Sequence, residues 1–172
     1  MKIECDLTKE DYIEFNLNYM KSSSTMKRSL FMQRYIVPVI FMIIPFILVR
    51  FSGLPFWYLF AVFALTSIIW IIFYPKRIKS LVIKRISNML NEGKNKDMLG
   101  KHSLILDDNG ITDISSNVES NIKWGGVEKF IESNEYFFIY ISAVAAYIIP
   151  KRSFESEAEK NEFLNIIKEK IN

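Results

Sequence analysis

The apolar middle of the chain constrains its fold more than any other feature of the sequence. Between Tyr35 and Pro75 the only charged residue is Arg50, and the run from Phe51 to Tyr74 carries no charge at all. A helix needs about 20 mostly apolar residues to cross a hydrocarbon core roughly 30 Å thick. A protein of 172 residues could not bury such a segment on all sides. The sequence therefore predicts a membrane-spanning helix rather than the core of a water-soluble protein.

A second apolar run precedes the first. It extends from Tyr35 to Val49 and reaches about 20 residues when it is taken back to Leu30. Arg34 lies near its end, where a long side chain can place its charge among the lipid headgroups. Pro38 and Pro45 predict a kinked helix rather than an interrupted one, because a neighbouring helix can satisfy the freed carbonyl groups.

The residues between the two runs, 50–55, include Gly53 and Pro55 and predict a short turn. We therefore expect a transmembrane helical hairpin over residues 30–75, with helices at about 30–50 and 54–74. Basic residues lie at both ends of this hairpin, with Lys21, Lys27, Arg28 and Arg34 around its start and Lys76, Arg77, Lys79, Lys84 and Arg85 after it. The positive-inside rule then predicts a multi-pass protein of the plasma membrane with both termini in the cytoplasm.

The distribution of charge limits the possible partners and chemistry. Residues 1–100 carry 14 Lys and Arg against 7 Asp and Glu, whereas residues 101–172 carry 8 against 12. An acidic C-terminal part argues against nucleic-acid binding, which depends on neutralising phosphates. One cysteine and one histidine exclude a disulfide scaffold, a cysteine-based zinc site and catalysis that needs two histidines. We predict no enzymatic activity, no catalytic residue, no metal site and no cofactor.

Residues 1–29 predict a cytoplasmic strand followed by a helix. Ile3, Cys5 and Leu7 alternate with charged residues, which is the period of a half-buried strand. Cys5 is therefore expected to be a small buried apolar residue rather than a nucleophile. Thr8 is a candidate N-cap, with acidic residues in the first helical turn that follows.

Residues 76–100 predict a basic amphipathic helix, which begins at Pro75 and ends near Glu92, and then a polar linker. Basic residues close to an anionic membrane contribute about 1 kcal/mol each to binding. Two interpretations stay open, namely charge that only sets topology and charge that binds specific lipids. The glycines at 93 and 100 are too far apart for a phosphate-binding loop, and His102 stands where such a loop needs Ser or Thr.

From His102 onward the pattern becomes that of β-strands. Short alternating segments predict about six strands, at 102–107, 111–115, 118–124, 127–132, 136–141 and 145–149. Asp108-Asn109-Gly110 predicts a tight hairpin, because Asn and Gly tolerate positive φ. Ser156 and Glu159 form a capping box for a last helix that ends near Ile171. His102 is expected at the surface or at a strand edge.

A curled antiparallel sheet with one helix across it resembles a pleckstrin-homology-like (PH-like) barrel. The order of features is similar to that of the YcxB-like family of bacterial membrane proteins, and the matching stretches are 9–15, 124–127 and 149–154. The resemblance implies an α+β membrane protein with two transmembrane helices and a cytoplasmic PH-like domain at residues 101–172. It implies no catalytic residues. Since only about six strands are predicted in this domain, residues 2–7 are expected to pair with the same sheet.

These features favour a membrane-anchored cytoplasmic interaction module that binds a protein or peptide partner along an exposed strand edge. One alternative is an anionic-lipid sensor, and another is an accessory subunit of a membrane transporter or channel. The candidate contacts for lipid or partner are Lys76, Arg77, Lys79, Lys84, Arg85, Lys151 and Arg152. The sequence leaves the identity of the partner and homo-oligomerisation open.

Overall fold

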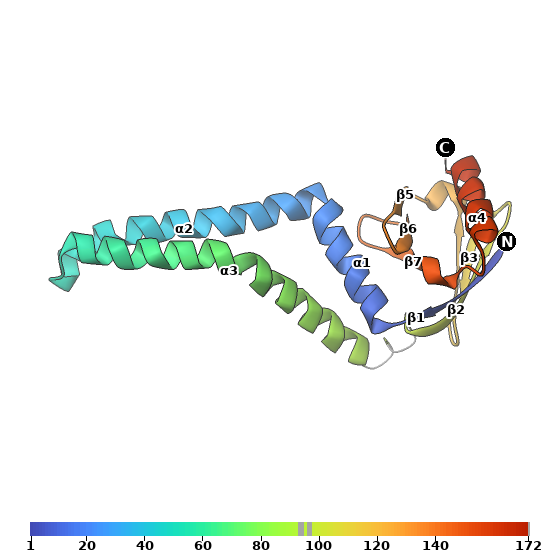
Figure 1. Ribbon diagram of the computed structural model, residues 1–172, viewed down its shortest axis with the longest axis horizontal. Coiled ribbons are helices and arrows are strands. Elements are labelled where there is room, and N and C mark those ends of the chain that lie inside the picture. The colour runs from blue at the N-terminus through green and yellow to red at the C-terminus, as the bar shows by residue number, and fades with distance from the viewer. Residues whose placement is uncertain (93–94, 96–97, 172) are drawn as a thin grey trace. The chain divides into compact units, whose positions relative to one another are not determined.

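The computed structural model describes residues 1–92, 95 and 98–171, and it contains both helices and antiparallel sheets, as expected for an α+β protein (Figure 1). The chain divides into two compact units. The helical unit comprises Leu17–Lys84, and the sheet unit comprises Met1–Asn16 together with the chain from Arg85 onward. The expected polar linker and the faint phosphate-loop pattern lie partly outside the described residues, because positions 93–94 and 96–97 belong to both.

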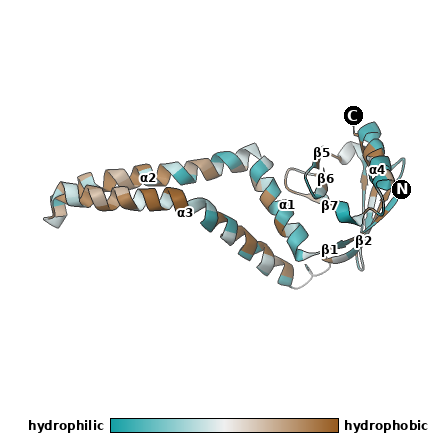
Figure 2. Cartoon of the chain, in the orientation of Figure 1, coloured by the Kyte–Doolittle hydropathy of each residue, from teal (hydrophilic) through white to brown (hydrophobic). Residues whose placement is uncertain are grey.

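Two long apolar helices dominate the helical unit. Helix α2 (Ser24–Ser52) has 29 residues, and helix α3 (Phe56–Asn91), which continues into the sheet unit, has 36. Both are long and apolar enough to cross a membrane, and they lie side by side along their most hydrophobic stretches (Figure 2). Gly53, with a φ of 65°, ends α2 and makes the expected turn. Only 11% of the most apolar window of each helix is buried, so the outer surfaces are apolar and exposed.

Helix α3 continues through Pro75, where the sequence predicted a new helix to begin. Proline lacks the N–H that would bond the carbonyl four residues earlier, which is that of Ile71. Arg34 of α2 supplies the missing donor, since its Nε lies 3.1 Å from the Ile71 carbonyl oxygen. Next to it, the Tyr74 hydroxyl donates to Gln33 Oε1 at 3.1 Å. A contact from the neighbouring helix thus compensates for the proline and keeps α3 continuous.

We expect Arg34→Ala to destabilise the helical unit by about 1 kcal/mol, the size of an interhelical hydrogen bond in a membrane protein. Pro75→Ala restores the N–H partner of the Ile71 carbonyl, so it should remove most of the sensitivity to Arg34→Ala. A double-mutant cycle measured by SDS titration of the protein in micelles checks this coupling. Arg28→Ala is the matched control. If Arg34→Ala lowered the stability of the helical unit equally in wild type and in Pro75→Ala, the assigned role of Arg34 would be contradicted.

Within the described residues, the sheet unit contains two antiparallel sheets, helix α4, the first part of α1 and the end of α3. The first sheet contains β1 (Lys2–Leu7), β2 (Gly100–Leu106), β3 (Gly110–Ile114) and β4 (Glu119–Lys123) in that spatial order. The second contains β5 (Lys129–Glu132), β6 (Tyr136–Tyr140) and β7 (Ala146–Pro150). Helix α1 (Lys9–Ser22) follows β1, and helix α4 (Glu157–Lys170) ends the unit. Ser156 Oγ accepts a hydrogen bond from the Glu159 N–H, which confirms the predicted helix start.

The N-terminal strand completes the first sheet. Strand β1 pairs antiparallel with β2, from Lys2 opposite Ile105 to Leu7 opposite Gly100, as the strand count led us to expect. The chain therefore leaves the sheet at the end of β1, forms the helical unit, and returns to the neighbouring position in the same sheet. The helical unit is an insertion between two paired strands.

The hairpin between β2 and β3 lies where the sequence predicts it. The predicted reason for it, a turn that uses positive φ, is wrong. Among the described residues only Gly53 and Gly100 have positive φ, so the turn does not use left-handed backbone. Instead the Asp107 carboxylate accepts hydrogen bonds from the N–H groups of Asn109 (2.8 Å) and Gly110 (3.0 Å). Glycine is required at 110 because a Cβ there would overlap the backbone carbonyl of Ile122 on β4.

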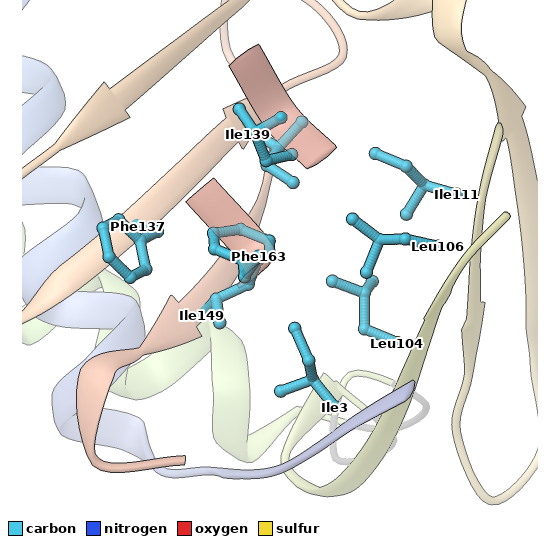
Figure 3. Packing of buried hydrophobic residues seen from close by; sticks show 9 residues of the cluster. Ile3, Leu104, Leu106, Ile111, Phe137, Ile139, Ile149 and Phe163 are labelled. Atoms are coloured by element: carbon cyan, nitrogen blue, oxygen red, sulfur yellow. The ribbon is translucent and has the colours of Figure 1, made fainter. Parts of the chain in front are cut away.

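The core lies between the two sheets and is closed by α4 (Figure 3). Its buried members are Ile3, Leu104, Leu106 and Ile111 from the first sheet, Phe137, Ile139 and Ile149 from the second, and Phe163 and Ile167 from α4. The Phe163 ring packs 5.2 Å from that of Phe137 and 5.4 Å from that of Phe154, centroid to centroid. Each such side chain contributes about 1.5–3 kcal/mol through burial, so α4 is an integral part of this fold.

Candidate functional site

A cleft of about 180 Å³ lies between the two sheets, beside the apolar core. The first sheet places Cys5, His102, Asp113 and Ser120 along it, and Tyr12 of α1 also lines it. The register explains this gathering, since Cys5 pairs with His102 across β1 and β2, and Asp113 pairs with Ser120 across β3 and β4. Polar side chains at inward positions of a sheet are unusual unless they are hydrogen-bonded. We therefore take the cleft as the candidate site.

His102 is the most constrained residue of the cleft. Its Nδ1 lies 3.1 Å from Asp113 Oδ1, and its Nε2 lies 3.2 Å from the Met98 carbonyl oxygen. Both partner atoms are hydrogen-bond acceptors, so this geometry favours hydrogen on both ring nitrogens, which is the imidazolium form. The hydrogen bond to Asp113 raises the pKa of His102, and burial offsets this only in part.

The expectation that His102 lies at the surface or at a strand edge is wrong, since the residue is 9% exposed. The physical reason is the pairing of β1, which turns β2 from an edge strand into an inner strand. Strand β1, which comes from a distant part of the sequence, therefore covers β2, whose own sequence has the pattern of an edge strand.

The thiol of Cys5 and the hydroxyl of Tyr12, which also line the cleft, are held uncharged. Burial raises the pKa of the Cys5 thiol to about 12, and burial followed by the Asp113 charge raises the pKa of the Tyr12 hydroxyl to about 12. Cys5 is 5% exposed, which confirms the expected burial. Nucleophilic cysteines need a lowered pKa and a base that can take the proton. Both nitrogens of His102 are engaged elsewhere, so this arrangement does not activate the thiol.

We expect the charged state of His102 to make stability depend on pH. A raised pKa in the folded state contributes stability that is fully present below the unfolded value, about 6.5, and is lost as the pH rises through the folded value. The free energy of unfolding of the sheet unit should therefore fall as the pH rises from about 6.5 through the raised pKa of folded His102. Urea titrations of wild type and His102→Asn check this. A variant that keeps the same slope with pH would contradict the assignment.

A second cluster surrounds Asp11, which is 1% exposed. Arg152 donates to its two carboxylate oxygens at 2.8 and 2.6 Å, and the Tyr136 hydroxyl donates at 2.9 Å. Thr8 adds its N–H at 2.8 Å and its hydroxyl at 2.9 Å. Burial alone would raise the pKa of Asp11, but the hydrogen bonds from Arg152, Thr8 and Tyr136 outweigh it and lower the pKa. We call these four residues the Asp11 clasp.

The sequence analysis identified only part of the clasp. Thr8 as N-cap and Asp11 three residues later follow a capping-box pattern, and this signal was available. Arg152 and Tyr136 lie 141 and 125 residues away, and no local pattern connects them to Asp11. The clasp fixes the first turn of α1 to β6 and to the short 3-10 turn Lys151–Ser153.

The predicted lipid or partner contacts fall into two environments. Five of them lie exposed on α3, namely Lys76, Arg77, Lys79, Lys84 and Arg85, and no ion pair within the described part of the chain involves them. Lys151 and Arg152 instead have internal partners. Lys151 pairs with Glu132 at 2.5 Å and lies over the Phe137 ring, and Arg152 belongs to the clasp. The two groups lie in different units except for Arg85, which is in the sheet unit.

A more open depression of about 440 Å³ lies on the outer side of β1, β2 and β3. It carries charges of both signs, from Glu4, Asp6 and Lys101, and Ser103 Oγ is buried nearby without a partner. No group of three metal-ligating side chains occurs among residues 1–92, 95 and 98–171. The cleft between the sheets is the better-defined of the two sites, because His102 pairs with Asp113 and Ser120 pairs with Tyr147 in it.

Comparison with protein families identifies one segment. Residues 106–167 match the family described as YcxB-like protein, which confirms the predicted resemblance for this part of the chain. The segment runs from the end of β2 into α4 and includes neither β1 nor the helical unit. Comparisons with curated proteins and with solved structures found no match.

Proposed function

From the YcxB-like domain at residues 106–167, we propose that this protein is a membrane-anchored interaction module without enzymatic activity. Helices α2 and α3 cross the plasma membrane as a hairpin, and both termini lie in the cytoplasm. The sheet unit is a PH-like domain that binds a protein or peptide partner. The observation that carries the proposal is the insertion of an exposed apolar hairpin between the paired strands β1 and β2.

The exposed surface of the helices supports the membrane location. Large apolar side chains such as Phe46, Trp57 and Ile72 are 59%, 76% and 58% exposed. Contiguous apolar surface on this scale is a feature of membrane or protein contact sites. The surplus of Lys and Arg outside the turn at 50–55 supports the cytoplasmic placement of both ends.

The arrangement of the strands supports a PH-like sheet unit. Four strands and three strands form two antiparallel sheets, and one C-terminal helix packs on the core between them. In this interpretation the helical hairpin takes the place of the loop between the first two strands. The chain therefore leaves the first sheet at Leu7 and re-enters it at Gly100, and these two residues are paired.

We expect cysteine labelling to show that the turn of the hairpin and the sheet unit lie on opposite sides of the membrane. In a Cys5→Ala background, single cysteines replace Ser52 in the turn and Ser116 in the sheet unit. A membrane-impermeant maleimide should label Ser52→Cys on intact cells and Ser116→Cys only after permeabilisation. The reverse pattern would contradict the proposed topology.

Crosslinking in native membranes before gentle solubilisation tests the interaction. The wild-type chain should yield the same protein partner in repeated preparations. Phe163→Ala removes a core side chain and should destabilise the sheet unit by about 3–5 kcal/mol while leaving helices α2 and α3 intact. A partner held by the sheet unit is lost in this variant. Recovery of lipid alone from wild type, or of a partner that Phe163→Ala retains, would contradict the proposal.

The exposed cations of α3 favour a second candidate, an anionic-lipid sensor. Charge reversal at Lys84 and Arg85 should reduce the anionic lipid that co-purifies with the full chain, and added salt should reduce it in wild type. Reversal at Lys160 and Lys168 on α4 is the control of equal charge. Arg152 is unsuitable for this test, because its reversal would break the Asp11 clasp.

A further inference from the structure

The depression of about 440 Å³ lies on the face of the first sheet that is turned away from the core. Ile3 of β1 and Leu104 of β2 enter the core, and successive side chains of a strand point to opposite faces. Their neighbours Glu4 and Ser103 therefore point outward, and both line the depression. Its volume falls within the range of about 300–1,000 Å³ that is typical of small-molecule sites.

The strand register brings opposite charges together in this depression. Asp6 of β1 lies opposite Lys101 of β2. In the next row Glu4 lies opposite Ser103, and Ser103 lies opposite Ile114 of β3. Directly opposite residues of an antiparallel pair have Cα atoms about 4.5–5.5 Å apart. An ammonium group and two carboxylates are therefore presented side by side on one face of the sheet.

Two of these charges are available to a ligand. Asp6 and Lys101 are both exposed, and within the described part of the chain no ion pair involves either side chain. Glu4 instead pairs with Lys2 at 2.7 Å. The hydrogen bond from Lys2 is the main cause of the lowered pKa of Glu4, and the charge of Lys101 acts in the same direction. Lys101 therefore lies near both carboxylates and is held by neither.

A hydroxyl group of the depression also has no partner. Ser103 Oγ is covered by neighbouring atoms, and among the described residues nothing forms a hydrogen bond with it. The large majority of buried polar side-chain atoms have such a partner. A change of rotamer about the Cα–Cβ bond moves this oxygen, so a group bound in the depression can supply the missing hydrogen bond. Ser115 and Ser116 add two further hydroxyl groups to the lining.

The charges of the lining determine which kind of ligand fits. An anion alone would meet two carboxylates, and a cation alone would meet the Lys101 ammonium group. A zwitterion whose two charged groups lie a few ångströms apart gives each free charge an opposite partner. Hydrogen bonds between charged groups are also stronger than those between neutral groups. Ile114, which is 37% exposed, offers the same ligand an apolar contact.

We propose that this depression binds a small zwitterion that carries a primary ammonium group and a phosphate or carboxylate group. The ammonium group donates hydrogen bonds to Asp6, and the anionic group accepts them from Lys101 and from the Ser103 hydroxyl. A free metabolite and the phosphoethanolamine headgroup of a membrane lipid share this chemistry. The inference goes beyond the proposed function, because it requires neither a protein partner nor a membrane.

Titration of the full chain in dodecylmaltoside micelles with O-phosphoethanolamine tests the site. The ¹³C-labelled δ1 methyl group of Ile114, assigned with Ile114→Val, reports occupancy. We expect a saturable shift of its resonance. Ethanolamine lacks the anionic group, inorganic phosphate lacks the ammonium group, and phosphocholine lacks N–H donors, so each should bind at least about tenfold more weakly. No saturable shift, or equal binding of any of these three compounds, would overturn the proposal.

Substitutions in the depression test the assigned contacts. Lys101→Met and Asp6→Asn should each weaken the binding of phosphoethanolamine at least about tenfold, and Ser103→Ala should weaken it about twofold to tenfold. Lys123→Met and Glu128→Gln are the matched controls, since these two residues lie outside the lining. Unchanged methyl resonances of the core isoleucines show that a variant is folded. A folded Lys101→Met or Asp6→Asn variant that binds as tightly as its control would overturn the proposal.

Lipid nanodiscs distinguish the two sources of the ligand. In nanodiscs of phosphatidylglycerol alone, the Ile114 resonance should keep the position of the unbound chain. A shift when phosphatidylethanolamine is added to the nanodiscs, with no further shift from free phosphoethanolamine, identifies the headgroup as the ligand. A shift with free phosphoethanolamine alone identifies a soluble zwitterion. A shift in phosphatidylglycerol alone would overturn the proposal, because this lipid has no ammonium group.

Discussion

Replacing Arg152 by alanine is expected to lower the free energy of unfolding of the sheet unit by about 3 kcal/mol, because removing one partner of a buried ion pair leaves an uncompensated charge. In wild type Asp11 is 1% exposed, and the variant loses the two hydrogen bonds that it accepts from Arg152 at 2.8 and 2.6 Å. Tyr136 and Thr8 still donate to the carboxylate, which places the loss at the lower end of the range for such pairs. The large effect comes from the desolvated carboxylate, since the Arg152 side chain is itself 53% exposed.

Lys151→Ala provides the matched control. This neighbouring cation pairs with Glu132, whose side chain is 50% exposed, and an exposed pair of this kind contributes at most about 1 kcal/mol. Urea unfolding followed by the fluorescence of Trp124 checks both variants, in a chain where Trp57 and Trp70 of the helical unit are replaced by Phe. Equal losses for the two variants would show that the clasp does not stabilise the sheet unit.

The pH dependence of the free energy of unfolding distinguishes the loss of the Asp11 clasp from a general loss of packing. In wild type the lowered pKa of Asp11 contributes stability above the unfolded value of about 3.9, and this contribution is lost as the pH falls through the folded value. Without Arg152, burial becomes the dominant influence and the pKa of Asp11 should rise. The variant should therefore recover stability relative to wild type as the pH is lowered toward about 4.5. Constant destabilisation at all pH values would contradict this account.

Local patterns predicted the elements that depend on nearby residues. Charge-free runs predicted α2 and α3, alternation predicted the strands, and Ser156 predicted the start of α4. Each of these rests on a period or a cap that is contained within a few residues. The continuity of α3 through Pro75 could not be predicted in this way, because it depends on Arg34, 37 residues before the carbonyl that it bonds.

The candidate site depends on pairings across the whole sequence. His102 is buried because β1 pairs with β2, and Asp11 is buried against Tyr136 and Arg152, which follow it by 125 and 141 residues in the sequence. A single sequence contains no local signal for such pairs. The charge of Arg152 predicted a surface contact, yet the same charge serves to neutralise a buried carboxylate. The cleft likewise requires both sheets, so no single segment predicts it.

Because the helical unit is inserted between two paired strands, the sheet unit should fold when the helical unit is removed. Replacing residues 17–84 by a flexible linker of about 20 Gly and Ser residues, with a reach of roughly 25 Å, should give a soluble protein that unfolds cooperatively. The shortened chain retains every member of the core, the Asp11 clasp and both sheets. It loses the exposed apolar helices, which are the reason that the full chain is expected to require detergent.

The matched comparison is a chain that begins at residue 98 and therefore contains the whole YcxB-like segment but not β1. It loses Ile3, Cys5 and Leu7, which are 1%, 5% and 6% exposed, and it leaves β2 without a neighbour on one side. Burial of these side chains is worth on the order of 5 kcal/mol, which approaches the whole stability of a small domain. We expect this chain to be insoluble or unfolded by circular dichroism and size-exclusion chromatography. If it folds as well as the linked chain, β1 is dispensable and the helical unit is an N-terminal attachment rather than an insertion.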